Sequence, residues 1–198
     1  MNSAEYKLKG LSPLIMHNNQ AANPFNDYCK AMKPITKKRN KTDDDFMEIA
    51  RLEWEAGLYL HDGVVAMPAA NLERCFWDGA KKRKMGKQFK SGAMVQDDFH
   101  TLAYQGKRIS VKQNGDIPNP NLDEFFQTHK HQTIVRVSNQ QVLRTRPIFY
   151  EWSMVLTVVF DPQVLDLRSV TETLQDAGRL VGLGDWRPRF GRFEVESL

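Results

Sequence analysis

The sequence lacks the motifs that most often mark an enzyme active site. Its 198 residues contain no Gly-x-x-x-x-Gly-Lys-Ser/Thr phosphate loop, no Gly-x-Ser-x-Gly nucleophile turn and no His-Glu-x-x-His metal-binding helix. Gly182 and Gly184 lack the third glycine of a dinucleotide-binding fingerprint, and they follow a predicted helix instead of a strand. These absences favour a binding protein over an enzyme, and we expect no cofactor.

Cysteines and long apolar runs are also scarce. Cys29 and Cys75 lie far apart and match no metal-ligand spacing, which predicts reduced thiols in a cytoplasmic protein. No early segment resembles a signal peptide, and no apolar run approaches the roughly 20 residues of a membrane span. At this length we expect a single domain over 1–198, with insertions at about 18–57 and 81–130.

Positive charge is only slightly in excess over the whole chain, with 28 Lys and Arg against 24 Asp and Glu. Local clusters therefore indicate a partner better than the total does. The first cluster ends a polar segment, 18–41, whose prolines and weak apolar periodicity predict a long mobile loop. Its cations are Lys37, Lys38, Arg39 and Lys41.

Thr42 follows this cluster and predicts the start of a helix, because its hydroxyl can cap the first turn. The aspartates at 43–45 suit the positive end of the helix dipole, so we interpret them as a solvated first turn instead of a metal site. The predicted buried stripe of this helix is Phe46, Ile49, Ala50 and Trp54.

The second cation cluster lies at the end of another predicted helix. An Asp62-Gly63 turn predicts a hairpin of 58–61 with 64–67, and Pro68 then opens a helix over 69–84. The inward face of this helix is predicted to be Leu72, Cys75, Phe76 and Ala80. Its end carries Lys81, Lys82, Arg83 and Lys84, followed by Lys87 and Lys90. This exceeds what the helix dipole needs and predicts a basic prong.

Alternating apolar residues predict several strands. The first covers 5–11, and strands at 133–137 and 141–149 place Arg144 and Arg146 on one face. Segment 151–160 is apolar on both faces, which predicts a central strand. The order of elements predicts an α+β fold of modified ferredoxin-like or RNA-recognition type, with helical and loop insertions and one sheet face open to single-stranded nucleic acid.

The last stretch combines glycines, arginines and an aromatic residue. A helix over 170–181, with Leu174, Ala177 and Val181 on one face, is predicted to stop at Gly182 and Gly184. A loop follows, and then a last strand of Phe190, Arg192, Phe193 and Val195, in which Gly191 marks a bulge or a close backbone approach.

This loop has the chemistry of a nucleic-acid contact. Gly182 and Gly184 let main-chain N–H groups approach a phosphate, and Trp186 offers a stacking face. The phosphate-binding cations are predicted to be Arg187, Arg189 and Arg192. The alternative is a glycine-capped helix followed by solvated arginines.

Histidines supply the remaining candidates. His129 and His131 have a spacing that a metal could use, but we interpret them as polar residues before a strand and predict no metal site. His17 could act as a general base in RNA cleavage, although no partner group is visible beside it in the sequence.

Three stretches together resemble the RAMP superfamily of CRISPR-associated proteins. They are Gly10-Leu-Ser-Pro-Leu-Ile-Met-His17 after the first strand, Val65-Ala-Met-Pro-Ala-Ala-Asn-Leu72 at a helix entry, and the glycine-rich loop Gly182-Leu-Gly-Asp-Trp-Arg-Pro-Arg-Phe-Gly-Arg192. The chain looks most like the backbone subunits that polymerise along a guide RNA. It is shorter than many of them, and Asp185-Trp186 stands where a more basic or glycine-rich pair is expected.

The resemblance implies a modified RNA-recognition fold, guide-RNA (crRNA) binding at fixed intervals, and head-to-tail assembly into a helical ribonucleoprotein filament with other effector subunits. It thus implies a non-enzymatic role in antiviral defence, with a complementary target strand as a second ligand. Arg144 and Arg146 would line the sheet face, and the two lysine-rich clusters would grip a strand. Two alternatives remain open: a RAMP-type RNA endonuclease using His17, and a guide-independent protein that binds or anneals single-stranded DNA.

Overall fold

Helices and antiparallel strands alternate along the chain, which confirms the predicted α+β class. The structure is a computed structural model that describes residues 1–111, 122–137 and 139–198. It divides into two compact units, one built from 1–14, 60–119 and 149–198 and the other from 15–59 and 120–148. The insertion predicted at about 18–57 falls wholly in the second unit. Of the one predicted at about 81–130, residues 81–111 belong to the first unit and 122–130 to the second, and 112–121 lie outside the described residues.

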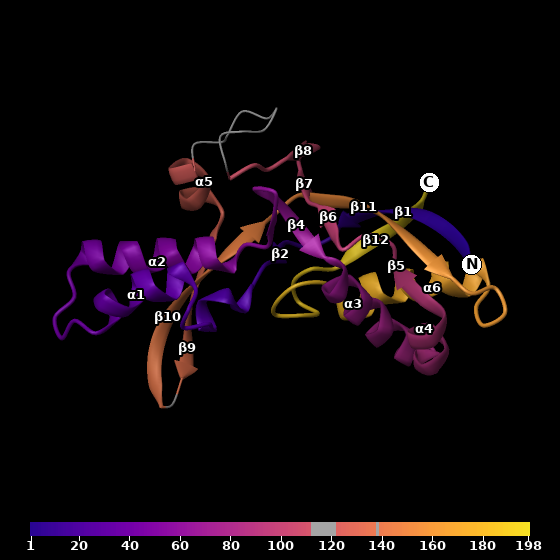
Figure 1. Ribbon diagram of the computed structural model, residues 1–198, viewed down its shortest axis with the longest axis horizontal. Coiled ribbons are helices and arrows are strands. Elements are labelled where there is room, and N and C mark those ends of the chain that lie inside the picture. The colour runs from indigo at the N-terminus through magenta and orange to yellow at the C-terminus, as the bar shows by residue number, and fades with distance from the viewer. Residues whose placement is uncertain (112–121, 138) are drawn as a thin grey trace. The chain divides into compact units, whose positions relative to one another are not determined.

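The first unit is organised around an antiparallel sheet whose strands differ in length (Figure 1). Its strands run in the order β12–β1–β11–β7–β8, and β5 also pairs with β11. They are β1 (Asn2–Gly10), β5 (Ala93–Val95), β7 (Ala103–Tyr104), β8 (Lys107–Arg108), β11 (Trp152–Phe160) and β12 (Phe193–Ser197). Because β11 has partners on both edges, the prediction of a central strand here is confirmed.

One face of this sheet forms the core of the first unit. Tyr6 and Leu8 of β1 pair with Leu156 and Met154 of β11, and all four side chains are buried. The residues between them point the other way, and Val155 is 45% exposed. The second apolar face of β11 is therefore an open surface, not a second core.

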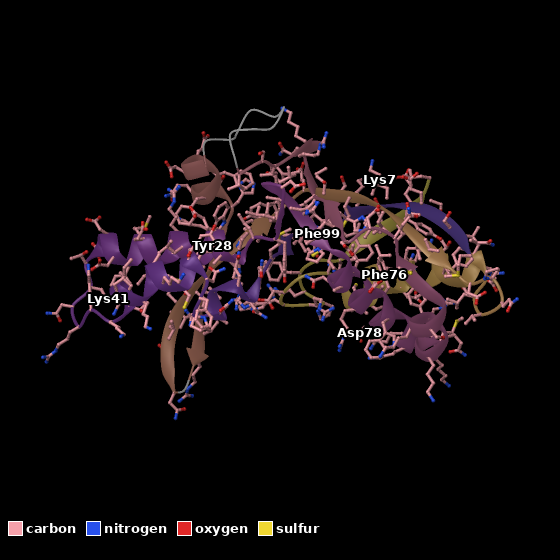
Figure 2. The ribbon with its side chains drawn as sticks, viewed as in Figure 1. Lys7, Tyr28, Lys41, Phe76, Asp78 and Phe99 are labelled. Atoms are coloured by element: carbon pink, nitrogen blue, oxygen red, sulfur yellow. The ribbon has the colours of Figure 1, made fainter. Side chains whose placement is uncertain are left out.

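Helices cover the buried face of the sheet, and contacts with it come from α3 and α6 (Figures 1 and 2). The helices of this unit are α3 (Ala69–Lys82), α4 (Gly86–Gly92) and α6 (Leu167–Asp176), with the π-helical turn η2 (Ala177–Val181) after α6. Phe76 of α3 meets Phe193 of β12 edge to face at 6.5 Å, and the Tyr6 hydroxyl lies 2.9 Å from that of Thr171 in α6. The four inward residues predicted for α3 are all buried, which confirms that face.

The helix α3 follows the predicted hairpin. The hairpin joins β3 (Leu60–His61) to β4 (Val64–Pro68), and β6 (Phe99–Thr101) extends it. Asp62 and Gly63 have φ values of 51° and 79°, the left-handed pair that this two-residue turn requires, so the predicted turn is confirmed. α3 ends at Lys82, two residues before the predicted end, because Lys84 has a φ of 60°.

The second unit combines helices with a three-stranded sheet in the order β2–β10–β9. Its elements are β2 (Leu14–Ile15), η1 (Asn19–Ala22), α1 (Asp27–Thr36), α2 (Asp43–Gly57), α5 (Leu122–Thr128), β9 (Lys130–Val137) and β10 (Gln140–Phe149). The predicted strands at 133–137 and 141–149 are confirmed as the antiparallel hairpin of β9 and β10. In the part of the chain that the structure describes, no helix has both the length and the apolar content to cross a membrane.

The prediction of a long loop over 18–41 is wrong, because this segment forms η1 and α1. The side chain of Asn26 caps α1 by accepting a hydrogen bond from the backbone N–H of Tyr28. Tyr28, Met32 and Ile35 recur at helical spacing and are half-buried, and α1 packs against α2. Burial, together with the charge of Glu55, raises the pKa of Tyr28.

The start of α2 is predicted correctly, but its buried stripe is only partly right. Thr42 and Asp45 form a reciprocal capping box. Ala50 and Trp54 are buried, and Trp54 donates a 2.8 Å hydrogen bond to the His129 carbonyl and packs against Phe125 and Phe126 of α5. Phe46 continues the same row in the first turn, yet it is 53% exposed. The spacing of apolar residues identifies the row on the helix, but it does not show how many of these residues other elements cover.

Trp54→Ala and Phe46→Ala test this difference within one helix. Trp54→Ala removes a buried ring and a hydrogen bond and should lower the free energy of unfolding by about 3–5 kcal/mol. Phe46→Ala should change it by less than about 0.5 kcal/mol, because the ring is largely solvated. Urea denaturation followed by far-ultraviolet circular dichroism measures both. Equal losses would mean that Phe46 is covered in solution.

Candidate nucleic-acid interface

The glycine-rich loop begins where α6 widens into the π-helical turn η2. The N–H of Gly182 closes this turn on the carbonyl of Ala177 at 2.9 Å, and the φ of Gly182 is 78°. Gly178 lets η2 lie directly against β12, because a Cβ at this position would come within 2.2 Å of the Phe193 carbonyl. Wide turns of this kind inside helices often accompany functional sites.

Gly191 ties the base of the loop to the rest of the first unit. The N–H of Leu183 donates to Gly191 O and the N–H of Gly191 donates to Pro13 O, both at 2.8 Å. Gly191 has a φ of 74°, and a Cβ there would lie 1.7 Å from the Leu183 carbonyl oxygen. No side chain fits in this space, which confirms the close backbone approach predicted for Gly191.

The structure brings together two of the stretches that carry the family resemblance. The backbone N–H of Leu11 donates to the Arg192 carbonyl at 2.7 Å, and the Ser12 hydroxyl accepts from the N–H of Arg192 at 2.9 Å. The last strand begins at Phe193 and not at Phe190, so the predicted start is wrong. The positive φ of Gly191 interrupts the extended backbone just before Arg192.

Gly182 makes its close contacts within the protein. Its carbonyl accepts a hydrogen bond from the Cys75 thiol at 3.1 Å, and a Cβ at Gly182 would lie 2.8 Å from the Phe190 carbonyl oxygen. Gly182 is buried and Gly184, with a φ of 79°, is half-buried. The conformational freedom of both residues therefore shapes the loop, and the predicted approach of Gly182 to a phosphate has no room at this burial.

The tip of the loop is exposed. Trp186, whose φ is 57°, is 40% exposed and lies 6.4 Å from the Phe190 ring between centroids. Arg187 and Arg189 are exposed on the tip, and Arg192 is exposed beyond it. A firmly anchored base thus presents the predicted aromatic and cationic side chains to solvent.

A hollow of about 520 Å³ brings Arg187 near the basic end of α3. It is lined by Asp78, Lys81, Lys82, Leu180, Val181, Arg187 and Pro188. Asp78, labelled in Figure 2, faces the same hollow as the cations. Two candidate groups that are about 100 positions apart in the sequence therefore line one surface.

The cations at the end of α3 differ in how the protein uses them. Lys81 pairs with Asp78 at 3.0 Å and lies 3.5 Å above the Trp77 ring. Burial raises the pKa of Asp78, but hydrogen bonds from Lys81 and Arg74 outweigh this and leave the pKa below its ordinary value. Asp78 is therefore a charged carboxylate that offsets part of the local positive charge.

Arg83 has a structural position that the sequence did not reveal. It forms ion pairs with Glu172 and Asp176 of α6, and these hydrogen bonds and charges raise its pKa. Arg83 thus joins α3 to α6, whereas Lys82 and Lys84 are exposed.

The other lysine-rich cluster lies in the second unit, at the turn between α1 and α2. Lys38 pairs with Asp45 at 2.6 Å, and the Lys41 ammonium donates to the Lys38 carbonyl at 2.9 Å. The hydrogen bond from Lys38 lowers the pKa of Asp45. Lys37 and Arg39 are exposed, and Lys41 is labelled at this turn in Figure 2. Part of the cluster therefore stabilises the entry to α2.

Arg144 and Arg146 line a pocket of about 460 Å³ in the second unit. The prediction that Arg144 and Arg146 lie on one face is confirmed. They are two residues apart on β10 and lie opposite Thr133 and His131 of β9. Arg144 pairs with Glu53 of α2. The pocket also includes His17 and Arg136, and Arg136 was overlooked because strand alternation assigns it to the other face.

His129, one of the two histidines whose spacing a metal could use, forms a core contact. His129 is buried and stacks on Phe125 at 3.8 Å between centroids, and its Nδ1 lies 3.2 Å from the Phe125 carbonyl oxygen. Burial lowers the pKa of His129. Within the described ranges, no three His, Cys, Asp or Glu side chains are grouped so that they could hold a metal ion.

Comparison with known proteins returned no match: no protein-family model fits the sequence, and no curated protein is significantly similar to it.

Gly191→Ala tests the anchoring of the loop, with Gly106→Ala as its matched control. Both glycines have a φ of 74°, but nothing lies within 4 Å of a Cβ at Gly106. Gly106→Ala should cost only the conformational strain of about 1–2 kcal/mol. Gly191→Ala adds the clash with Leu183 and should lower the melting temperature further. Similar melting temperatures for the two variants would contradict the tight contact at Gly191.

Cys75 should be unreactive in the folded protein. Burial raises the pKa of Cys75 to about 12, so at pH 8 almost none of it is the nucleophilic thiolate. A thiol-specific reagent should modify the half-buried Cys29 in native protein and Cys75 only after unfolding. Cys29→Ser should remove the fast reaction. A fast reaction that persists in this variant would show that the packing around Gly182 opens in solution.

Proposed function

We propose that this chain is a non-enzymatic subunit that binds single-stranded nucleic acid, and that its ligand is the guide RNA of a CRISPR effector filament. The observation that carries the proposal is the surface shared by Arg187, Lys81 and Lys82 around the hollow, next to the exposed Trp186. The anchored base fixes the backbone of the loop before any ligand arrives, which reduces the entropy lost on binding.

The chemistry of this surface suits a phosphate backbone. Guanidinium groups form charge-assisted, often bidentate hydrogen bonds with phosphate, and ammonium groups add point charges. Trp186 adds an aromatic face on which any base can stack. Such contacts tolerate any sequence, as a subunit that holds guides of many sequences requires.

The sheet of the first unit also supports the proposal. Its order β12–β1–β11–β5, with α3 between β1 and β5 and α6 between β11 and β12, is the arrangement expected of a ferredoxin-like or RNA-recognition-type fold. Lys7, labelled in Figure 2, and Val155 are paired in register on the face opposite the helices. This open face would lie along a strand in the manner of RNA-recognition sheets.

An RNA endonuclease using His17 is the weaker candidate. General acid–base cleavage needs a second proton-transfer group near the first. The carboxylate in the same pocket, Glu53, already accepts hydrogen bonds from Arg144 and from the N–H of Thr145. The preference for RNA over DNA comes from the three resembling stretches, so the binding experiment must compare the two.

Arg187→Ala combined with Arg189→Ala tests the interface. Each lost charge-assisted bond should weaken binding by about 1.5–3 kcal/mol, roughly tenfold or more per arginine. The salt dependence of binding should also become shallower, because fewer counterions are released from the strand. Fluorescence anisotropy with labelled single-stranded RNA and DNA, at several salt concentrations, measures both effects.

The matched control is Arg108→Ala with Arg168→Ala, which removes the same charge from exposed positions of the first unit outside the loop. It should bind nearly as tightly as the unmodified chain and assemble to the same size with RNA in gel filtration. If both double variants lose affinity equally, only the net charge matters. Tighter binding of DNA than of RNA would favour the guide-independent alternative.

A further inference from the structure

A second pocket of the first unit, which we call the α3–α4 pocket, has a lining that the proposed phosphate contacts do not explain. Its volume is about 340 Å³, and α3, α4, β5 and β11 bound it. Most of its lining residues are apolar, among them Phe76, Trp77, Phe89 and Met94. Its charged lining residues are Glu73, Arg74 and Lys90. A mainly apolar pocket with a few polar groups is typical of a ligand site.

One row of residues on α3 connects this pocket to the hollow that Arg187 lines. Arg74 and Trp77 line the pocket, and Asp78 and Lys81 line the hollow. Lys81 lies 3.5 Å above the Trp77 ring. Asp78 pairs with Arg74 and with Lys81, both at 3.0 Å. Because these residues recur at three- and four-residue intervals, they share one side of the helix. The pocket therefore begins within one helical turn of the proposed phosphate contacts.

The charges along this row attract a strand only weakly. Arg74, Lys81 and Lys90 carry three positive charges. Glu73 and Asp78 carry two negative charges, which leaves an excess of one positive charge. Attraction of phosphate therefore does not account for the pocket, and its apolar lining requires an apolar body as well. A nucleotide within a strand has both parts, a phosphodiester with one negative charge and a flat base.

Glu73 gives the pocket an acceptor that can select between bases. Its side chain is half-buried, and its Oε1 accepts a 3.0 Å hydrogen bond from the Val95 N–H, which orients the carboxylate between α3 and β5. A carboxylate has about four acceptor sites, so Glu73 can accept further hydrogen bonds. A ligand atom that faces it must donate, because an acceptor there would lose its hydrogen bonds to water without replacement.

A base meets these requirements better than a side chain of a protein partner does. An apolar side chain would fill the lining, but it offers Glu73 no donor and leaves the neighbouring cations unused. Extruded bases are commonly held between aromatic and apolar side chains and read by hydrogen bonds to their edges. The exocyclic amino group of cytosine donates to a carboxylate, whereas the oxygen at the same position of uracil is an acceptor.

We infer that the α3–α4 pocket receives one base of the bound strand, and that Glu73 selects a base with an exocyclic amino group over uracil. The inference rests on the proposed function, because the strand must first lie on Arg187 and Lys81. It adds a base preference, which phosphate contacts cannot supply. Since only one base for each chain enters the pocket, the other positions of the strand stay unread.

Short RNA strands of cytidine alone and of uridine alone test the inference on the full chain, because the two bases have nearly the same size. Fluorescence anisotropy at neutral pH should show that the cytidine strand binds about fivefold more tightly or more. Glu73→Gln keeps an acceptor for the Val95 N–H and adds a donor that suits uracil, so the ratio of the two affinities should fall to about one. Glu151→Gln removes the same charge from an exposed residue of the first unit outside the pocket. This matched control should leave the ratio unchanged.

Ala70→Phe tests the pocket without changing any charge. Ala70 lines the pocket and is exposed, so an added ring occupies the space for the base without entering the core. The affinity for the cytidine strand should fall to that for the uridine strand. The melting temperatures of this variant and of Glu73→Gln should stay close to that of the unmodified chain, which shows that both are folded.

Failure of the interface and failure of the pocket give different results. Arg187→Ala with Arg189→Ala should weaken binding of both strands by the same factor and leave their ratio unchanged. If the unmodified chain binds the two strands equally or prefers uridine, or if the preference for cytidine survives either Glu73→Gln or Ala70→Phe, the pocket does not read a base although the interface still stands. Binding of neither strand would overturn both, since the pocket acts only on a bound strand.

Discussion

The geometry of the candidate interface depends on a close backbone contact that leaves no room for a side chain. At Gly191 the chain passes so close to Leu183 that only a glycine fits, and the same residue bonds to Pro13. This contact fixes both ends of the exposed tip, because Leu183 precedes it and Gly191 follows it. The loop is therefore held as a closed turn on the edge of the first unit. Arginines mounted on such a turn lose less entropy on binding than arginines on a loose loop would.

The basic side chains at the end of α3 are not equally available to a ligand. Lys81 shares its charge with Asp78, but both are near the surface, where such pairs contribute only about 0–1 kcal/mol. Lys81 can therefore exchange the carboxylate for a phosphate at little cost. Arg83 is bound by two carboxylates of α6 and is less exposed, so releasing it would loosen the contact between two helices. The number of cations in a sequence cluster thus overstates the number that can meet a partner.

Local sequence signals predicted local structure well in this chain. Thr42 marked a helix start and Asp62-Gly63 marked a turn, because the chemistry of a cap or a left-handed turn involves neighbouring residues. The segment 18–41 was mistaken for a loop, since the half-buried row that begins at Tyr28 is short and lies among lysines. The exposure of Phe46 depends on which elements cover a helix, which spacing does not encode.

In the candidate sites, too, local features could be predicted from the sequence and contacts between distant residues could not. The glycines and arginines of the last stretch were recognisable as candidate site residues, because glycine has unusual backbone freedom and arginine carries a positive charge. The meeting of Arg187 with Lys81 and Lys82 required the fold, as did the pairing of Arg144 with Glu53 and the presence of Arg136 in the same pocket. These contacts join residues that are distant in the sequence, and nothing in the local pattern indicates them.

The anchoring of the loop also determines when the interface can form during folding. Ser12 and Arg192, which meet at its base, are 180 residues apart, and β12 must pair with β1 before they do. Contacts between distant segments form late, because closing a long chain segment costs entropy that local contacts do not. A partly folded chain would carry the same arginines on an untethered loop and would bind a strand weakly. Under the proposed function, tight binding would therefore be reserved for chains that have completed their sheet.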